Sequence, residues 1–462
     1  MDTVLAIDLG GSSLRAALVA RDGRIVASAE RRHRVGEEAD AEGWWGMLVE
    51  AVAELPRADV KAIIATGFTR SQVLVDGAGR AVRPAQCFAD TRATAEAVEL
   101  AGAARGTWVE MTAFHPAARL RWAKAHDPAA FARARHVLQP KDFLVLRLTG
   151  RVAADRISNA WALDRRGNVR ALPLFRRAQL DAALLPELFD PWDVVGPCTG
   201  LPGFDGVPVM CGAMDTWCAS LGAGAARPGD AYLIAGSTDA GGVLSDAPAE
   251  AEGLVTQPWG IGLYHTGGPS GGGGDCLQWL AEVLGQPHVS SVVALAERAT
   301  VGMAPLLFLP ALAGERAPSW AAATRGSFVG LDRAHGAAEM ARAVMEGVAF
   351  ADRDLLGGLP FDRLFLAGGG AQSDMWCQIR ADVLGCQVLR THGQPGLVGA
   401  ALVAWAGLGV FASLPAAQAV VQNVATEFRP DRTVISRYQR LFEVFKQVQT
   451  MAGTLAHGLS RF

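Results

Sequence analysis

Three consecutive glycines lie between an apolar run and a helical pattern in the last quarter of the chain. Residues 364–367 predict a buried strand, Gly368-Gly369-Gly370 follows directly, and a helical pattern then extends to Leu384. Glycine lets the backbone approach a flat or anionic ligand closely, and a helix start presents free N–H groups to it. The order strand, glycine turn, helix favours an α/β layer arrangement, although plain packing would also explain this one turn.

A second glycine turn lies near the N-terminus, in a predicted hairpin between residues 4–7 and 16–19. The turn carries glycines, hydroxyls, one carboxylate and one arginine, namely Asp8, Gly10, Gly11, Ser12, Ser13 and Arg15. Backbone amides and hydroxyls of such a turn can surround phosphate oxygens, which an arginine neutralises. A carboxylate at a strand end can hold a hydrated Mg²⁺. An ordinary hairpin with glycines at positive φ is the alternative.

A third glycine turn repeats this pattern in the middle of the chain. Residues 232–235 predict a strand, the turn contains Gly236, Ser237 and Thr238, and residues 240–244 predict the returning strand. One such hairpin at the start of each half indicates an internal duplication with a nucleotide between the halves.

The composition is that of an ordinary soluble globular protein. The chain has 462 residues, 50% of them hydrophobic and 19% charged, with a net charge of −3. This length is sufficient for two domains, and the absence of a long basic face argues against nucleic acid as a partner. The 7 cysteines form no CxxC pair, so we expect them to be small buried residues in a reducing compartment.

One uncharged region, residues 393–424, resembles a membrane segment. Gly407, Gly409, Ser413 and Pro415 interrupt it, so it predicts a buried helix, a turn and a second helix starting near residues 413–415. No basic region precedes an apolar core at the N-terminus, so we expect no signal peptide, no membrane partner and a cytoplasmic protein.

Strand and helix patterns alternate along the rest of the chain, which predicts α/β layering. Predicted strands cover residues 60–67 and 208–212, and predicted helices cover 93–103, 118–124, 128–135, 215–224 and 337–356. Residues 225–230 are rich in turn formers and predict the crossing point between the halves. Residues 266–275 contain many glycines and predict either a flexible loop or backbone lining a ligand cleft.

An ordered series of motifs resembles the FGGY carbohydrate kinases, and within them the xylulokinase-like branch. The series comprises residues 8–13, 140–150, 212–216, 309–318, 342–350 and 368–385. The resemblance covers essentially the whole chain and implies an α/β fold of two ribonuclease H/actin-like domains flanking a nucleotide and sugar cleft. The implied domains are 1–228, on the sugar and phosphate side, and 229–462, on the nucleotide side. The implied activity is ATP- and Mg²⁺-dependent phosphorylation of a sugar or polyol hydroxyl, and a homodimer is left open.

The resemblance identifies Asp215 as the catalytic base. Phosphoryl transfer needs an oriented hydroxyl, and a carboxylate can accept its proton as the oxygen bonds to phosphorus. Asp215 follows a predicted strand and a glycine turn at the start of a helix. As an isolated feature, it would more simply be explained as a helix cap.

The resemblance also implies the remaining site residues. Phosphate contacts fall on Gly10, Gly11, Ser12, Ser13, Arg15, Gly236, Ser237 and Thr238. Adenosine contacts fall on Gly369, Gly370, Ala371 and Ser373, with Gln378 nearby. Sugar contacts fall on Thr69, Arg70, Asp90, Arg92 and Asp215, and Mg²⁺ contacts on Asp8, through water, and Asp215.

Two stretches depart from the family pattern. Xylulokinases usually have Met-His-Gly where this chain has Thr69-Arg70-Ser71, so D-xylulose, a related ketopentose, another polyol or ketose, and a sugar acid all stay open as acceptors. Glycerol-, ribulose- and gluconate-kinase-like activities are therefore alternatives, as is an inactive sugar or ATP sensor of the same fold. The second departure is Gln394-Pro395-Gly396, where a glutamate is common, and we expect it to change loop geometry near the nucleotide.

Overall fold

The computed structural model describes residues 1–104, 107–109, 111–164, 173–299, 305–391, 393–421 and 424–459. The chain forms two compact units. Unit 1 comprises Met1–Gly222, Gln257–Gly262 and Gln394–Gln422, and unit 2 comprises Ala223–Thr256, Leu263–Gly393 and Asn423–Phe462. Two later segments thus return to unit 1, whereas we expected each of the domains 1–228 and 229–462 as one continuous stretch. The roles assigned to these domains stay a prediction.

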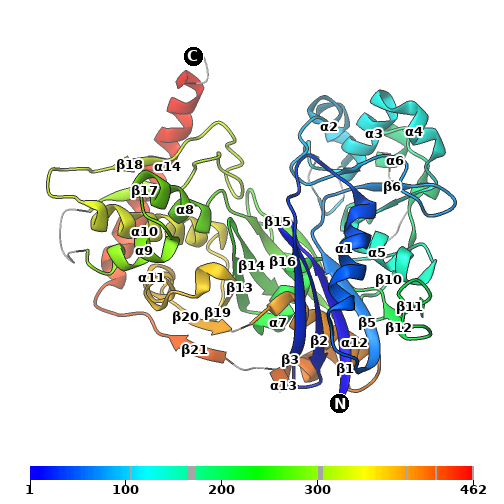
Figure 1. Ribbon diagram of the computed structural model, residues 1–462. Helices are drawn as coiled ribbons and strands as arrows, with labels where there is room; N and C mark the ends of the chain where they lie inside the picture. The colour runs from blue at the N-terminus through cyan, green and yellow to red at the C-terminus, as the bar shows by residue number, and fades with distance from the viewer. Residues whose placement is uncertain are drawn as a thin grey trace. The chain divides into compact units, whose positions relative to one another are not determined.

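Unit 1 contains a mixed sheet, shown in blue in Figure 1 for its N-terminal strands. Its order is β3 (Ile25–Arg32), β2 (Ser13–Ala20), β1 (Asp2–Leu9), β5 (Asp59–Gly67), β12 (Pro208–Met210) and β11 (Val194–Pro197). The pairs β3–β2, β2–β1 and β12–β11 are antiparallel, while β1–β5 and β5–β12 are parallel. Three parallel strands therefore end at one edge of this sheet.

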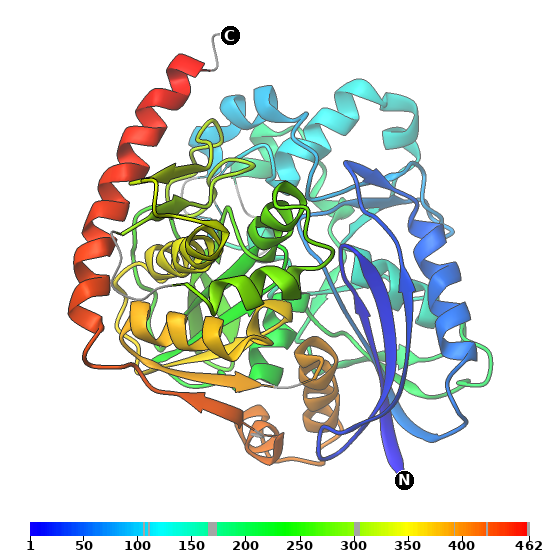
Figure 2. The same ribbon diagram turned by 60° about the vertical axis from the view of Figure 1, so that its left-hand side comes forward.

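Helices cover both faces of the unit 1 sheet. Leu5 and Ile7 pack with Trp44 of α1 (Ala41–Ala53) and Phe143 of α5 (Pro140–Thr149). Side chains alternate along a strand, so the intervening residues face the other side. There α12 (Pro395–Gly407) packs on β1, β2 and β5, and it lies beside the blue strands in both ribbon views (Figures 1 and 2).

A smaller helical layer completes unit 1. It contains α2 (Thr94–Leu100), α3 (Pro116–His126), α4 (Pro128–Arg133) and α6 (Pro173–Arg177), which share a core around Leu120, Trp161 and Phe175. The predicted helix over 93–103 is α2 followed by a 3₁₀ turn, Ala101–Ala104.

Unit 2 repeats the same order of strand pairings. Six of the seven strands of its sheet are, in order, β16 (Leu263–Pro269), β14 (Asp239–Ser245), β13 (Asp230–Ala235), β19 (Arg363–Ala367), β20 (Gln387–Thr391) and β21 (Val424–Phe428), and the seventh is β15 (Val255–Gly260), next to β16. The pairs β16–β14, β14–β13 and β20–β21 are antiparallel, while β13–β19 and β19–β20 are parallel. These six strands thus share the topology of the unit 1 sheet, as the predicted duplication requires.

Five α-helices pack in the described part of unit 2. They are α8 (Gly274–Val283), α9 (Val289–Ala296), α10 (Ala337–Leu355), α11 (Asp374–Leu384) and α14 (Ile435–Leu459). Figure 2 shows α14, in red, extending to the C-terminal end of the chain. The core among these helices includes Phe308, Phe350 and Phe445.

The remaining described elements are short. They are the strand pairs β4 (Glu38–Ala39) with β7 (Ala85–Gln86), β6 (Val73–Val75) with β8 (His136–Leu138), β9 (Ala153–Asp155) with β10 (Glu187–Phe189), and β17 (Leu307–Leu309) with β18 (Ser327–Val329), together with β15 (Val255–Gly260), α7 (Asp215–Ala223) and α13 (Leu414–Val421). The two helices α12 and α13 confirm the prediction for residues 393–424. No helix among the described residues is long and apolar enough to cross a membrane.

The glycine-rich segment 266–275 is not a loop throughout, and its place in a ligand cleft stays a prediction. Its first part belongs to β16, which pairs in register with β14. A Cβ atom on Gly267 would lie 2.1 Å from the carbonyl oxygen of Gly241, and one on Gly242 would lie 2.2 Å from the ring of His265. The glycines here allow two strands to approach closely, so they are a packing feature of the sheet.

Candidate active site

The carboxyl ends of three neighbouring strands bring several predicted site residues of unit 1 together. Asp8 lies at the end of β1 and is in register with Thr66 of β5. Gly67, at the end of β5, forms a bridge with Met214, and the hydroxyl of Thr66 donates to the carbonyl of Ala213 over 2.8 Å. Asp215 follows at once as the first residue of α7. Ligand sites commonly form at such strand ends.

The turn that leads to Asp215 is held from two sides. Gly212 has φ +68°, and a Cβ atom there would lie 2.0 Å from the carbonyl oxygen of Ala65, so only glycine fits beside β5. On the other side, the ammonium of Lys141 donates to the carbonyl of Cys211 over 3.0 Å. Lys141 is fully buried and also pairs with Asp142 at 2.5 Å and Asp155 at 2.8 Å. The backbone before Asp215 is therefore fixed by charge and by packing.

The carboxylate of Asp215 is oriented by its own helix start. Its Oδ1 atom accepts from the backbone N–H of Thr216 at 2.6 Å and from the Thr216 hydroxyl at 3.1 Å. Burial raises the pKa of Asp215, and the two hydrogen bonds from Thr216 oppose that rise. A raised pKa makes the carboxylate a better proton acceptor. Within the described part of the chain, Oδ2 has no hydrogen-bond partner.

Asp8 is the second carboxylate at this edge. Its pKa is raised to about 7, by burial first and by the charge of Asp215 second, while Arg15 opposes the rise. Its Oδ1 atom is shielded from solvent and has no partner among the described residues. Gly396, near the start of α12, leaves room beside it, since a Cβ atom there would lie 3.0 Å from Asp8 Oδ2. The Gln394-Pro395-Gly396 departure thus lies beside Asp8 in unit 1.

The chemistry of this pair suits a hydrated Mg²⁺. No group of three or more His, Cys, Asp or Glu side chains in the described ranges could hold a metal ion. Mg²⁺, however, is commonly bound through one or two carboxylates together with water and substrate phosphates. The unpartnered oxygen of Asp8 fits such an ion.

The turn of the first hairpin is partly exposed to solvent. Gly10 donates to the carbonyl of Ser13 over 2.9 Å, Ser12 is exposed and Ser13 is buried. A hydrogen bond from Ser13, then the charge of Arg15, lowers the pKa of Glu30 against an opposing effect of burial. Arg15 forms a partly exposed 3.0 Å ion pair with Glu30 and stands opposite Asp8 in the β1–β2 register.

Asp90 and Arg92 pair as predicted, but the aspartate is completely covered. Its carboxylate accepts from Arg92 Nε at 3.0 Å, Arg92 Nη2 at 2.9 Å and Gln86 Nε2 at 3.0 Å, and Asp90 is 0% exposed. Although burial opposes it, the bonds from Arg92 and Gln86 lower the pKa of Asp90. This arrangement favours a role for Asp90 in holding Arg92 over direct contact with a hydroxyl.

Arg119 connects the two predicted sugar motifs and was missed from the sequence. Its guanidinium donates to the carbonyls of Arg70, Phe88 and Asp90, the last at 2.7 Å. Arg70 itself has φ +54°, and Thr69 beside it is half-buried. Arg119 lies on α3 and is 0% exposed. A helical pattern in the sequence does not reveal the long-range partners of a charged side chain, so this role was not predicted.

His115 is a second residue that the sequence did not reveal. It caps α3, where its Nδ1 atom accepts from the backbone N–H of Ala117 at 3.1 Å. Its pKa is lowered to about 3, by burial first and by the charge of Arg70 second, so the ring is neutral at pH 7. Nε2 therefore carries the proton, and this buried atom has no partner among the described residues.

Unit 2 brings the other two glycine turns side by side. Gly368 has φ +100°, and a Cβ atom there would lie 2.4 Å from the carbonyl oxygen of Ala235, directly before Gly236. Ser237 and Gly369 are exposed, and Gly236 and Thr238 are partly so, whereas Gly370 and Ala371 are buried. Ser373 caps α11 by accepting from the N–H of Trp376 at 3.2 Å. Only part of the predicted adenosine set therefore faces solvent.

Gln378 serves the structure of unit 2. Its amide donates to Asp382 at 2.8 Å and to the carbonyl of Arg429 at 2.9 Å. These contacts do not reach the glycine turns.

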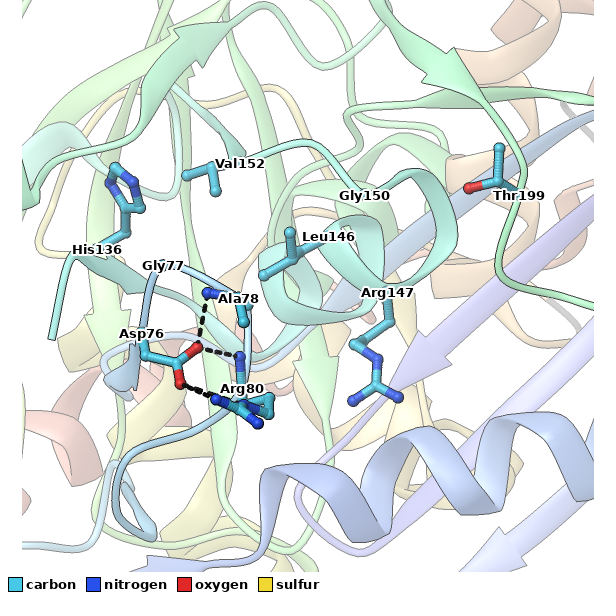
Figure 3. Close-up of a pocket in the computed structure, with 11 residues that line it drawn as sticks. Asp76, Gly77, Ala78, Arg80, His136, Leu146, Arg147, Gly150, Val152 and Thr199 are labelled. Atoms are coloured by element: carbon cyan, nitrogen blue, oxygen red, sulfur yellow. Dashed lines mark hydrogen bonds and ion pairs between the residues drawn. The ribbon is translucent and has the colours of Figure 1, made fainter. Parts of the chain in front are cut away.

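A separate hollow of about 480 Å³ lies in unit 1, away from all of these residues (Figure 3). Asp76, Arg80, His136, Arg147 and Thr199 are among its lining residues. Asp76 is turned toward Arg80 and toward the backbone of the same loop, as the dashed lines in Figure 3 show. The hollow contains none of the predicted site residues.

Two family models match this chain over most of its length. The FGGY family of carbohydrate kinases, N-terminal domain, matches residues 3–222, and the C-terminal domain of the same family matches residues 231–408. The chain is 31% identical over 448 residues to the xylulose kinase of Escherichia coli (strain K12), covering 87% of this chain and 89% of that protein.

Solved structures share the fold. The xylulose kinase from Rhodospirillum rubrum has a TM-score of 0.87 at 28% identity, over 98% of this chain and 100% of that one. The gluconate kinase from Lactobacillus acidophilus has a TM-score of 0.89 at 23% identity, over 98% of both chains, and shows the actin-like fold alone. The repeated sheet topology, the carboxylates at the strand ends and the two matching models have one explanation: the chain belongs to the FGGY family of carbohydrate kinases.

Proposed function

We propose that this protein transfers the γ-phosphate of ATP to a hydroxyl of a sugar or polyol, with a ketopentose such as D-xylulose as the leading acceptor. The observation that carries the proposal is Asp215, a carboxylate at the edge of the unit 1 sheet whose turn is fixed by Gly212 and Lys141. Relatives named xylulose kinase over most of the chain support the choice of acceptor.

Asp215 acts as the general base in this proposal. Thr216 holds Oδ1, which leaves Oδ2 to accept the proton of the attacking hydroxyl. The raised pKa of the carboxylate supports this step, because a stronger base assists the hydroxyl more as its bond to phosphorus forms. Thr69 and Arg70, together with the Arg92 that Asp90 orients, are the residues that would bind the acceptor.

Mg²⁺ would be held by Asp8, through water, and by Asp215. When bound, the ion would neutralise negative charge on the phosphate group that is transferred. The unpartnered Oδ1 of Asp8 and its pKa of about 7 support this assignment, since a bound cation would favour the ionised carboxylate. Gly10, Gly11, Ser12, Ser13 and Arg15 would bind phosphate oxygens from unit 1.

ATP would contact the glycine turns of unit 2. The first of these turns, Gly236-Ser237-Thr238, is accessible to phosphate. In the predicted adenosine turn, Gly369 is accessible, Gly370 and Ala371 are buried, and Ser373 lies at the start of the following helix. Backbone N–H groups in such turns bind phosphate oxygens well.

A sugar acid is the second candidate acceptor. Arg70, Arg92 and Arg119 lie near two carboxylates, because Asp90 and the arginines all affect the pKa of Arg119 and Arg92 also pairs with Glu38 at 2.7 Å. The neutral His115 adds a buried N–H donor. This surplus of positive charge would complement a carboxylate on the acceptor. The expectations of a cytoplasmic protein and of a homodimer stay predictions.

The test is ADP release with Mg-ATP against a panel of ketopentoses, alditols and sugar acids. We expect one acceptor to stimulate release, and Asp215→Asn to lower kcat by roughly 10²–10⁴-fold. Asp205→Asn, at an exposed position of unit 1, is the matched control and should leave kcat unchanged. Full activity in Asp215→Asn would exclude it as the base, and a lack of stimulation by every acceptor, with ATP still bound, would favour a sensor.

A further inference from the structure

A buried arginine ties together the two glycine turns of unit 2. Arg380 of α11 donates through Nη2 to Asp239 at 2.7 Å, through Nε to Asp352 at 2.8 Å and through Nη1 to the carbonyl of Gly370 at 3.1 Å. All three charged side chains are 0% exposed. The guanidinium also lies 4.3 Å from the ring centre of Trp376. One side chain thus bridges three separate elements.

Two of these partners belong to the predicted nucleotide turns. Asp239 directly follows Gly236-Ser237-Thr238 at the start of β14, and Gly370 lies within the turn after β19. Asp239 is also held by its main chain, which donates to Gly272 at 3.1 Å and accepts from Ser270 at 2.8 Å. Arg380 therefore fixes the distance between an anchored hairpin and the Gly370 turn.

The cluster places two carboxyl groups around one guanidinium. Burial, then the neighbouring Asp352, raises the pKa of Asp239 well above its usual range, against the opposing effect of Arg380. The Oδ1 atoms of Asp239 and Asp352 have no hydrogen-bond partner in the described ranges. A proton retained by the pair would let the two carboxylates coexist around one guanidinium. Removal of Arg380 would leave both of them buried without a cation.

We propose that Arg380 is a positioning residue for nucleotide binding, which sets the spacing of the Gly236–Thr238 hairpin and the Gly369 turn before ATP arrives. The inference rests on the proposed function, because it assigns these turns to ATP. Preorganised backbone donors bind a ligand more tightly, since the ordering cost is met in the free protein. Arg380 itself touches only protein groups, so it acts through the turns.

Substitution of Arg380 should have different effects if the ion cluster only stabilises the fold and if it positions the two turns. A structural role lowers the melting temperature and leaves the ligand constants of the folded protein unchanged. A positioning role raises the KM for ATP and the Kd for ADP, while the KM for the acceptor stays constant. The comparison requires a control arginine in the same unit that contacts neither turn, and a half-buried one is available.

Arg353 provides that control. It lies on α10, donates to the carbonyl of Val383 at 3.1 Å and packs 4.3 Å from the ring centre of Phe442, with no contact to either turn. We expect Arg380→Met to raise the Kd for ADP, measured by calorimetry, by roughly tenfold or more. Arg380→Lys should recover part of the loss, because it keeps the charge without the forked geometry. Arg353→Met should change the Kd less than about twofold.

Equal ADP affinity in folded Arg380→Met and the wild-type protein would overturn the inference. If Arg380→Met does not fold, Asp352→Asn keeps the shape of that side chain and removes its charge, and an unchanged Kd for ADP in this variant would overturn the inference as well. If the wild-type protein binds neither ADP nor ATP, the proposed function fails. In that case, amide hydrogen exchange at residues 235–239 and 368–371 tests whether the Arg380 cluster holds the two turns in place. Exchange that is no faster in Asp352→Asn than in Arg353→Met would overturn the inference.

Discussion

The ammonium of Lys141 donates to the carbonyl oxygen of Cys211 over 3.0 Å, at the start of the turn that ends in Asp215. The same ammonium forms ion pairs with two buried carboxylates, Asp142 and Asp155. The position of the proposed base is therefore linked to a buried ion cluster on α5 and β9.

Lys141→Met should destabilise unit 1 and impair catalysis together. Loss of one partner from a buried ion cluster leaves uncompensated charge and costs about 3–5 kcal/mol of unfolding free energy. We expect kcat to fall as well, because the turn before Asp215 loses one of its two supports. Urea unfolding and steady-state kinetics would measure both effects.

Lys61→Met is the matched control for that variant. Lys61 pairs with Asp59 at 2.7 Å on an exposed surface, so its loss should leave the free energy of unfolding almost unchanged. An equal effect of the two substitutions on stability would contradict the role of the buried cluster.

Gly399→Ala should destabilise the contact between α7 and α12. A Cβ atom on Gly399 would lie 1.8 Å from the carbonyl oxygen of Cys218, so the helices must separate by a substantial distance. We expect a loss of about 2 kcal/mol or more in the free energy of unfolding. Gly46→Ala on α1, where no atom lies within 4 Å of the added methyl group, should instead stabilise the protein by roughly 0.5–1 kcal/mol. The same sign of change in both variants would refute this account.

Arg119→Met should weaken acceptor binding without affecting ATP. Arg119 holds the carbonyls of Arg70 and Asp90, so its loss frees both segments that we assign to the acceptor. We expect the acceptor KM to rise roughly tenfold, which corresponds to about 1.4 kcal/mol. Arg121→Met, on the same helix but in an ion pair with Glu99, should leave that KM unchanged. A rise in the KM for ATP instead would contradict the assignment of these segments.

Stability should fall in acid partly because of His115. Its pKa in the folded protein is lowered to about 3, whereas an unfolded histidine titrates near pH 6.5. The unfolded state therefore binds the extra proton, so stabilisation is fully present above about pH 6.5 and is lost as the pH falls toward about 3. His115→Asn keeps a helix cap and removes this group. Between about pH 7.5 and pH 5, the wild-type protein should lose about 2 kcal/mol more than the variant in urea unfolding. Parallel curves would show that His115 does not contribute.

The sequence was sufficient for the regular elements and for the local glycine chemistry. The hairpins around Gly10 and Gly236 and the turn at Gly368 were predicted because strand and turn residues lie close together in the chain. The pairing of the β16 glycines with β14 was not predicted, because it depends on a strand that contacts them across the sheet. Arg119, Lys141 and Arg380 escaped notice for the same reason. Each is a charged residue on a helix, and only its long-range partners reveal that it is buried.

The return of α12 to unit 1 has a consequence for the order in which the protein acquires its structure during synthesis. The β1, β2 and β5 strands are made early, yet the helix that covers one of their faces, Pro395–Gly407, is translated only after nearly all of unit 2. Domains made on the ribosome generally fold as units, the N-terminal one first. Unit 1 cannot follow this order, since one apolar face of its sheet stays uncovered until all strands of the second sheet except β21 have been made. A nascent chain stalled before residue 395 should therefore be the species that chaperones bind, and release should follow once α12 has emerged.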